Sequence, residues 1–387
     1  MFSRRTAWSA VPNRIAEVLE ERRRSGRPVL DLTESNPTQV GLRMPEAEVC
    51  AALADGRALR YEPTPFGHAA ACAAVAAYHG GAVPPEHILL TASTSEAYAL
   101  LFKLLCDPGD RVLVPVPSYP LFEYLAGLEN VESVPYPCAW EDDGWFVDFA
   151  ALEQRLDDRT RALLAVSPNN PTGAMLRREE ADRLLALCRD RGLALIADEV
   201  FADHVFTDAP SRVRSLAGRD EALLFVLGGL SKTCLLPQLK AAWIAASGPA
   251  GLLDEALARL EIVADTYLSV NTPVQLALPR LLALRDLIRP RLVARLMANR
   301  HTLERALRGS AATPLPIDGG WSAVVRVPRH PGEEERTLRL LTRHGLRVHP
   351  GFFFDFPAEA FLVVSLLGRE DEFARGAAIL AADADAP

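Results

Sequence analysis

Short apolar runs alternate with helix-length amphipathic stretches between residues 47 and 247. The apolar runs have the length of buried strands and lie at 87–91, 111–115, 162–166, 193–197, 223–227 and 241–246. Helical patterns fill the spaces between them, for example at 97–106 and 178–190, and Pro108-Gly109-Asp110 marks one return from helix to strand. This alternation predicts an α/β fold with a mostly parallel central sheet wrapped by helices.

The pattern changes after residue 248. Long helical stretches follow at 252–264 and 273–307, and a domain boundary is expected between 280 and 290. An extended segment at 321–327, a helix near 333–344 and strands at 347–349 and 360–366 then predict a smaller α+β domain. The Ala- and Asp-rich tail at 377–387 is expected to fray.

Composition excludes several classes of protein. The chain has 387 residues, of which 49% are hydrophobic and 24% charged, as is ordinary for a globular protein. A net charge of -8 with scattered basic residues argues against a nucleic-acid partner. Six cysteines without a C-x-x-C pair signal neither a metal site nor a disulfide framework, and no apolar run is long enough to span a membrane. We therefore expect a cytoplasmic protein with no metal site.

Two polar segments follow predicted strands at the edge where α/β sheets place their ligands. In Thr91–Glu96, Ser93 and Glu96 have the spacing of a capping box, and the free N–H groups and hydroxyls would suit a phosphate. Ser167–Gly173 combines Pro, Asn and Gly and is typical of a turn. An ordinary helix cap and an ordinary turn explain each segment taken alone.

Two charged groups follow the next two strands. Asp198 closes the run 193–197, where a carboxylate is either a helix cap or a functional group. Lys232 comes soon after the run 223–227, and a lysine in a cleft becomes a nucleophile when its pKa is lowered. Most lysines are only solvated charges, so the combination of the four segments carries the argument.

These segments resemble the motifs of the class I/II aminotransferases, which are pyridoxal-phosphate (PLP) enzymes with the aspartate aminotransferase fold. The N-P-T-G motif stands at Asn170–Gly173, the D-E-V motif at Asp198–Val200 and the S-K-T motif at Ser231–Thr233. The resemblance implies PLP fold type I. It divides the chain into an N-terminal segment at 1–45 that joins the small domain, a large PLP-binding domain at 46–285 and a small domain at 286–387.

The resemblance also implies residue roles. Lys232 matches the catalytic residue that forms the Schiff base with PLP and moves a proton, and Asp198 matches the partner of the pyridine nitrogen. The other implied cofactor ligands are Asn170, Tyr119, Ser93, Thr94, Ser95, Ser231, Lys240 and Tyr61. Tyr61 matches a tyrosine that reaches the phosphate in the neighbouring subunit, which implies a homodimer with shared sites. The implied substrate-binding residues are Asn36, Trp321 and Phe353.

Three positions depart from the family pattern around the cofactor. Phe201 stands where a tyrosine is usual, Gly229 replaces a phosphate-binding serine, and Lys240 replaces a phosphate-binding arginine. Lysine keeps the charge of arginine and loses its bidentate geometry. The resemblance therefore implies a PLP site with fewer donors than usual.

A fourth departure concerns the substrate. Val363 stands where the family has the arginine that binds the substrate α-carboxylate. Either the alignment slips, or the substrate is held differently, or another cation serves, for which the candidates are Arg326, Arg347 and Arg369. The segment 261–275 contains no arginine for a second carboxylate, which disfavours an acidic substrate.

The function that follows from this resemblance is a PLP-dependent aminotransferase. It would transfer the amino group of a small or neutral amino acid to a 2-oxo acid through a pyridoxamine intermediate. The alternatives are a β-eliminating C–S lyase or a specialised biosynthetic PLP enzyme on the same scaffold, and a non-enzymatic relative that uses the fold as a ligand-sensing or interaction module.

Overall fold

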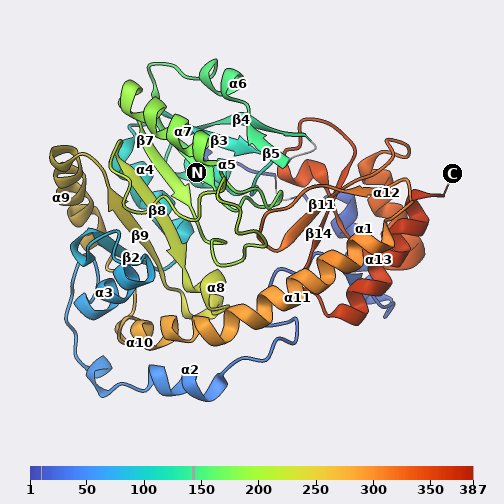
Figure 1. Ribbon diagram of the computed structural model, residues 1–387, viewed down its shortest axis with the longest axis horizontal. Helices are drawn as coiled ribbons and strands as arrows, with labels where there is room; N and C mark the ends of the chain where they lie inside the picture. The colour runs from blue at the N-terminus through green and yellow to red at the C-terminus, as the bar shows by residue number, and fades with distance from the viewer. Residues whose placement is uncertain (10, 142–143, 387) are drawn as a thin grey trace.

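The computed structural model describes residues 1–9, 11–141 and 144–386. Its centre is an eight-stranded sheet with the strand order β2-β9-β8-β7-β6-β3-β4-β5 (Figure 1). The strands are β2 (Ile88–Thr91), β3 (Arg111–Val116), β4 (Glu132–Glu141), β5 (Gly144–Val147), β6 (Thr160–Val166), β7 (Ala194–Asp198), β8 (Leu224–Gly229) and β9 (Ala242–Ser247). Neighbouring strands from β8 to β4 are parallel, whereas β9 and β5 are antiparallel to their neighbours. The predicted mostly parallel sheet is confirmed.

Helices cover both faces of this sheet because successive residues of its buried strands point to opposite sides. In β7, Ile196 packs in a core with α4, α5 and α9, whereas Leu195 packs in the other core with α3, α7 and α10. The α-helices of the described residues are α1 (Arg14–Arg24), α2 (Glu46–Leu53), α3 (Ala69–Tyr78), α4 (Thr94–Leu105), α5 (Phe122–Leu128), α6 (Phe149–Glu153), α7 (Arg178–Arg191), α8 (Leu230–Thr233), α9 (Ala250–Tyr267), α10 (Thr272–Ala283), α11 (Arg285–Ala306), α12 (Glu333–Arg339) and α13 (Glu370–Ala384).

A second, smaller sheet lies at the other end of the molecule beside α11, α12 and α13 (Figure 1). Its strands are β10 (Thr313–Pro314), β11 (Ser322–Arg326), β14 (Phe361–Ser365) and β13 (His349–Pro350), in that order. β1 (Leu30–Asp31) pairs in parallel with β12 (Leu346–Arg347), so the N-terminal part of the chain reaches this end. The expected bounds 1–45, 46–285 and 286–387 stay a prediction.

The structure differs from the sequence pattern in several elements. The single helical stretch expected at 273–307 is two helices, α10 and α11, which meet at Leu284. β4 was missed because Pro135 and Pro137 lack the N–H donors of a central strand and argue against one. The expectation of a frayed tail was wrong, because Leu380 and Ala384 of α13 are buried in the core.

A buried ion cluster joins α12 to α13. Asp383 accepts hydrogen bonds from Arg336 (Nη1 to Oδ2, 2.9 Å) and from Arg339 (Nε to Oδ1, 2.8 Å). The side chains of Arg336 and Asp383 are 1% and 4% exposed, so each buried charge depends on the other for compensation.

None of the helices in the described part of the chain combines the length and apolar character that a membrane crossing needs.

We expect Asp383→Ala to lower the free energy of unfolding by about 3–5 kcal/mol, because it leaves buried guanidinium groups without their partner. Asp371→Ala is the matched control: Asp371 also lies on α13, but its ion pair with Arg369 is exposed and long, at 3.5 Å. This control is expected to change stability little. Urea denaturation measures both, and equal small effects would contradict the structural role of the cluster.

Candidate active site

A cavity of about 260 Å³ opens at the carboxyl ends of β6, β7 and β8, the edge at which open α/β sheets bind ligands. The chain segments that follow these strands, together with the start of α4 and the first residue before β11, supply its wall. The lining residues are Ser35, Ser93, Thr94, Ser95, Tyr98, Tyr119, Phe122, Leu125, Val166, Asn170, Asp198, Val200, Phe201, Gly229, Ser231, Lys232 and Trp321.

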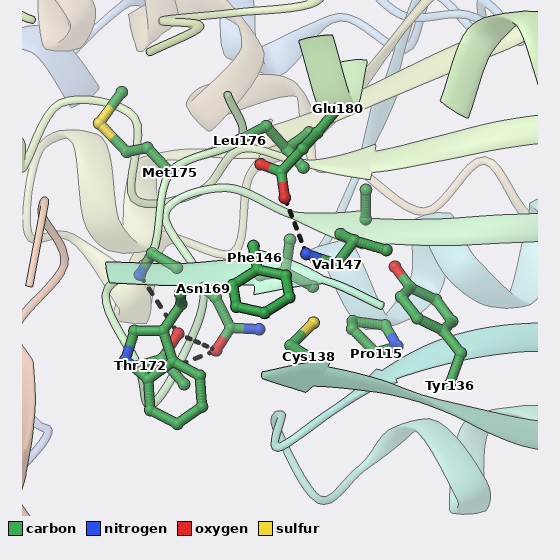
Figure 2. A pocket seen from close by; sticks show the side chains of 14 residues that line it. Pro115, Tyr136, Cys138, Phe146, Val147, Asn169, Thr172, Met175, Leu176 and Glu180 are labelled. Atoms are coloured by element: carbon green, nitrogen blue, oxygen red, sulfur yellow. Dashed lines mark hydrogen bonds between the residues drawn. The ribbon is translucent and has the colours of Figure 1, made fainter. Parts of the chain in front are cut away.

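The turn after β6 presents Asn170 to this cavity. Asn169 stabilises the turn, because its Oδ1 accepts hydrogen bonds from the Thr172 backbone N–H at 3.2 Å and from the Thr172 hydroxyl at 2.9 Å (Figure 2). Ser322 of β11 donates to Asn170 Oδ1 at 3.3 Å, which links the turn to the smaller sheet. The sequence predicted this turn, and the structure adds the link.

Gly173 ends the turn in the left-handed backbone region that favours glycine, at a point where a side chain has no room. Its φ is +68°, and a Cβ there would lie 2.4 Å from the carbonyl oxygen of Gly319. Its own carbonyl accepts the N–H groups of Asp318 and Gly319, at 3.1 and 2.9 Å. This close approach holds the segment that leads into Trp321, so the turn positions an aromatic wall of the cavity as well as Asn170.

Asp198 is the last residue of β7, and its side chain is buried. Its Oδ1 accepts the backbone N–H of Val200 at 3.1 Å, and its Oδ2 accepts the hydroxyl of Tyr98 at 2.9 Å. Burial raises the pKa of Asp198, while these donors and the charge of Lys232 lower it. The next residue, Glu199, lies outside the cavity lining; its Oε1 accepts the N–H of Leu216 at 2.6 Å.

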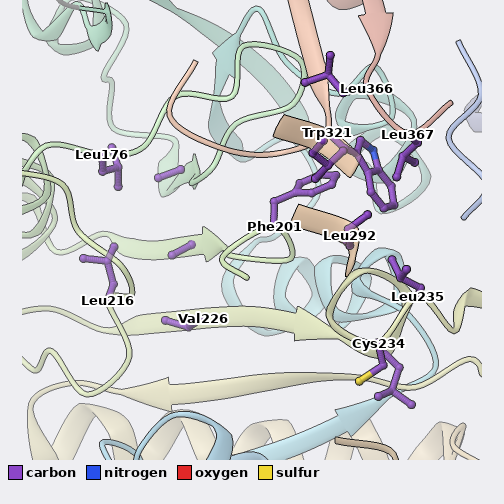
Figure 3. Packing of buried hydrophobic residues seen from close by; sticks show 14 of the residues in the cluster. Leu176, Phe201, Leu216, Val226, Cys234, Leu235, Leu292, Trp321, Leu366 and Leu367 are labelled. Carbon is purple, nitrogen blue, oxygen red and sulfur yellow. The ribbon is translucent and has the colours of Figure 1, made fainter. Parts of the chain in front are cut away.

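Lys232 lies in α8, just after β8, among aromatic rings. Its Nζ is 4.4 Å from the ring centre of Trp321 and 5.7 Å from that of Phe201. Figure 3 shows these two rings together, and His204 stacks on Trp321 with 5.6 Å between ring centres. Burial lowers the pKa of Lys232 to about 8, against the opposing effect of Asp198. A larger share of its amine is therefore neutral near pH 7 than for a solvated lysine.

The N-terminus of α4 forms the other end of the cavity. Ser93 is the N-cap, and its Oγ accepts the N–H of Glu96 at 3.1 Å, while the Glu96 carboxylate accepts the N–H of Ala92 at 2.6 Å. The N-cap at Ser93 is confirmed, whereas the Glu96 side chain bonds the N–H of Ala92 and not that of Ser93, so the reciprocal half of a capping box is not formed. Together with the hydroxyls of Thr94 and Ser95, this helix end offers donors and a positive dipole end to an anion.

The structure brings most of the predicted site residues into one cavity and leaves four outside its described lining. Lys240 is exposed and is itself the left-handed residue that follows the short 3-10 turn Pro237–Leu239. Tyr61 is 78% exposed, and Asn36 is exposed with its Oδ1 bonded to Thr38. Phe353 packs against His349 and the small-domain core. The predicted residues inside the cavity are Lys232, Asp198, Asn170, Tyr119, Ser93, Thr94, Ser95, Ser231 and Trp321.

Sequence reasoning missed Tyr98, Phe122 and Leu125. Tyr98 lies on the apolar face of α4, where an aromatic residue is usually core. Its hydroxyl was the available signal, because a buried phenol needs a hydrogen-bond partner and the helix starts at the cavity. Phe122 and Leu125 both lie on α5, and apolar side chains on a helix give no sign of a functional role.

The arginines proposed to replace the missing carboxylate ligand are engaged elsewhere. Arg347 pairs with Asp31 at 2.8 Å, Arg326 lies over the ring of Trp140, and Arg369 is exposed. Val363 itself is buried in an apolar cluster with Trp145, Val324, Phe354 and Phe361. Among the described residues that line the cavity, Lys232 is the one cationic side chain.

Comparison with known proteins decides the family. The model for aminotransferase class I and II matches residues 27–378. The chain belongs to this family. It is 30% identical over 284 residues to the alanine aminotransferase of Mycobacterium tuberculosis, which covers 70% of this chain and 65% of that protein. It is also 30% identical over 197 residues to the glutamate-pyruvate aminotransferase of Escherichia coli, covering 51% and 48%. The matches thus span about two thirds or less of these relatives.

The fold agrees with solved structures over nearly the whole chain. The alanine aminotransferase of Pyrococcus furiosus superposes with a TM-score of 0.85 at 22% identity, covering 97% of this chain and 99% of that one. At this identity the likeness shows the fold. The expected PLP fold type I is therefore confirmed.

PLP is the cofactor of this aminotransferase family, and the donor set of the cavity fits it. The capped end of α4 would hold the phosphate, Asp198 the pyridine nitrogen, and Lys232 the aldehyde carbon. Asn170 and the ring of Tyr119 complete the wall of the cavity. The residues present supply an anion site, a carboxylate and a reactive amine in one enclosure, as a phosphorylated pyridine aldehyde requires.

We expect Lys232→Ala to lose the covalent attachment of PLP that borohydride reduction makes permanent, whereas Lys240→Ala retains it. Intact-protein mass spectrometry reads out both. In the wild-type protein, capture of PLP should accelerate as pH rises through about 8, because the neutral amine is the nucleophile. A full yield of reduced adduct in Lys232→Ala would show that another amine reacts.

Proposed function

We propose that the protein is a PLP-dependent aminotransferase that transfers the amino group of a small or neutral amino acid to a 2-oxo acid. The observation that carries this proposal is the enclosure of Lys232 and Asp198 in one cavity of a class I and II family member. The chain's similarity to an alanine aminotransferase supports a small amino acid as donor, and its similarity to a glutamate-pyruvate aminotransferase supports a small 2-oxo acid as acceptor.

Asp198 and Lys232 have different roles, which follow from their charges. Bound PLP supplies an electron sink for negative charge that develops on the substrate Cα. The Asp198 carboxylate holds a proton on the pyridine nitrogen, which strengthens that sink. The Lys232 amine, with its pKa lowered by burial to about 8, takes the proton from Cα and returns it.

The walls of the cavity favour a neutral side chain on the donor. Trp321, Phe201 and Val200 are apolar surfaces, and among the described lining residues no arginine is available for a second carboxylate. An acidic donor would bring an additional uncompensated charge into this enclosure, at a cost in desolvation. Alanine and other neutral amino acids are therefore the first donors to test.

We also propose that the protein acts as a homodimer. Tyr61 supports this proposal, because it lies exposed and outside the cavity of its own chain, at a position that matches the tyrosine reaching a neighbouring subunit's phosphate. The cytoplasm is the compartment we propose. Its support is that all six cysteines are free thiols, as a reducing environment allows.

The proposed function predicts a two-step spectral cycle. Adding alanine to the PLP-loaded protein should bleach the visible band of the bound cofactor and release one equivalent of pyruvate, and a 2-oxo acid should restore the band. Aspartate should bleach it more slowly. Continuous release of pyruvate and ammonia from a β-substituted amino acid without a 2-oxo acid, with no bleaching, would assign the lyase reaction instead.

A second prediction concerns the donor carboxylate, for which the described cavity offers no arginine. Alanine and isopropylamine differ only by a carboxylate in place of a methyl group. We expect their dissociation constants, taken from saturation of the bleaching rate, to differ by less than about tenfold. A charge-assisted bond would give about 1.5–3 kcal/mol, which is about a ten- to hundredfold difference in affinity, so a preference for alanine above about tenfold would contradict this expectation.

A further inference from the structure

A tyrosine that faces the cavity from α4 forms the only side-chain hydrogen bond to Asp198 recorded among the described residues. Tyr98 is 2% exposed, and its hydroxyl donates to Asp198 Oδ2 at 2.9 Å across 100 positions of the chain. Its ring is fixed by an edge contact with Phe122, with 5.3 Å between ring centres. The hydroxyl is therefore held against the carboxylate by the packing of its ring.

This bond completes the fixation of the carboxylate. The other oxygen, Oδ1, is held by the Val200 N–H, so each oxygen has one donor from the protein. A carboxylate with both oxygens bonded is fixed in orientation, and donors to a carboxylate favour its ionised form. Burial in the cavity acts in the opposite direction and raises the pKa of Asp198.

We propose that Tyr98 is a positioning residue, which holds the Asp198 carboxylate ionised and oriented and thereby sets the affinity of the protein for PLP. The proposal rests on the assignment of PLP to this cavity. Tyr98 supplies no proton to the substrate, because burial and the neighbouring Asp198 raise the pKa of its phenol well above its usual value. Its contribution is a permanent hydrogen bond.

The chain offers a matched control in Tyr136. This tyrosine is 1% exposed, and its hydroxyl donates to the backbone carbonyl of Leu164 at 2.7 Å. Tyr98→Phe and Tyr136→Phe each remove one buried oxygen and keep the ring. Loss of packing or of a buried hydrogen bond should therefore affect the stability of the two variants alike, and only Tyr98→Phe removes a donor to Asp198.

The test measures the dissociation constant of PLP from the apo-proteins by absorption titration, with urea unfolding as the check on folding. We expect Tyr98→Phe to weaken PLP binding about tenfold, since a hydrogen bond to a charged group contributes about that factor or more. Tyr136→Phe should stay within about twofold of the wild type. In the Asp198→Asn background, Tyr98→Phe should weaken binding less than about threefold, because no charge remains to stabilise.

Two outcomes would overturn the proposal. One is equal PLP affinity in Tyr98→Phe and Tyr136→Phe, which would make the bond to Asp198 merely structural. The other is a full tenfold loss from Tyr98→Phe in the Asp198→Asn background, which would place its effect elsewhere. Failure of the cofactor assignment looks different, because then the wild-type protein itself binds no PLP.

Discussion

The site depends on two opposite charges enclosed in one cavity. Asp198 and Lys232 both lose solvation there, which raises the pKa of the acid and lowers that of the amine, and each partly offsets the effect on the other. Such a pair is costly to build and stays in place only when rigid elements hold it. The tyrosine on α4 bonds the acid, and the rings of Phe201 and Trp321 enclose the amine.

Rigidity comes from the sheet. Asp198 pairs with Val166 and Leu227 in the register of β6, β7 and β8, so the strand that carries the acid is fixed between neighbours. Gly173 then allows the turn after β6 to touch the segment before Trp321, which brings the two sheets together at the cavity. The same packing that stabilises the fold thus sets the position of the reactive groups. Substitutions elsewhere in this packing would therefore move the reactive groups.

Much of this could be predicted from sequence, and the exceptions have physical reasons. Local signals were sufficient for the capped helix at Ser93 and for placing Asp198 and Lys232 at or just after the ends of buried strands, because strand ends and caps are encoded by neighbouring residues. The roles of Asp198 and Lys232 followed only from the resemblance to the aminotransferase motifs. Tyr98 was missed because its partner is distant in the chain and its own pattern is that of a core residue. Lys240 was predicted from its position relative to a motif, and its exposure depends on how the turn after α8 packs, which the residue types did not reveal.

The central claim is that Asp198 is ionised and keeps a proton on the pyridine nitrogen of bound PLP. The most direct measurement is the nitrogen chemical shift of PLP labelled with ¹⁵N in the ring, recorded in the loaded protein near neutral pH. The account predicts the shift of a protonated ring nitrogen in the wild type and that of an unprotonated nitrogen in Asp198→Asn. An unprotonated nitrogen in the wild type would contradict it.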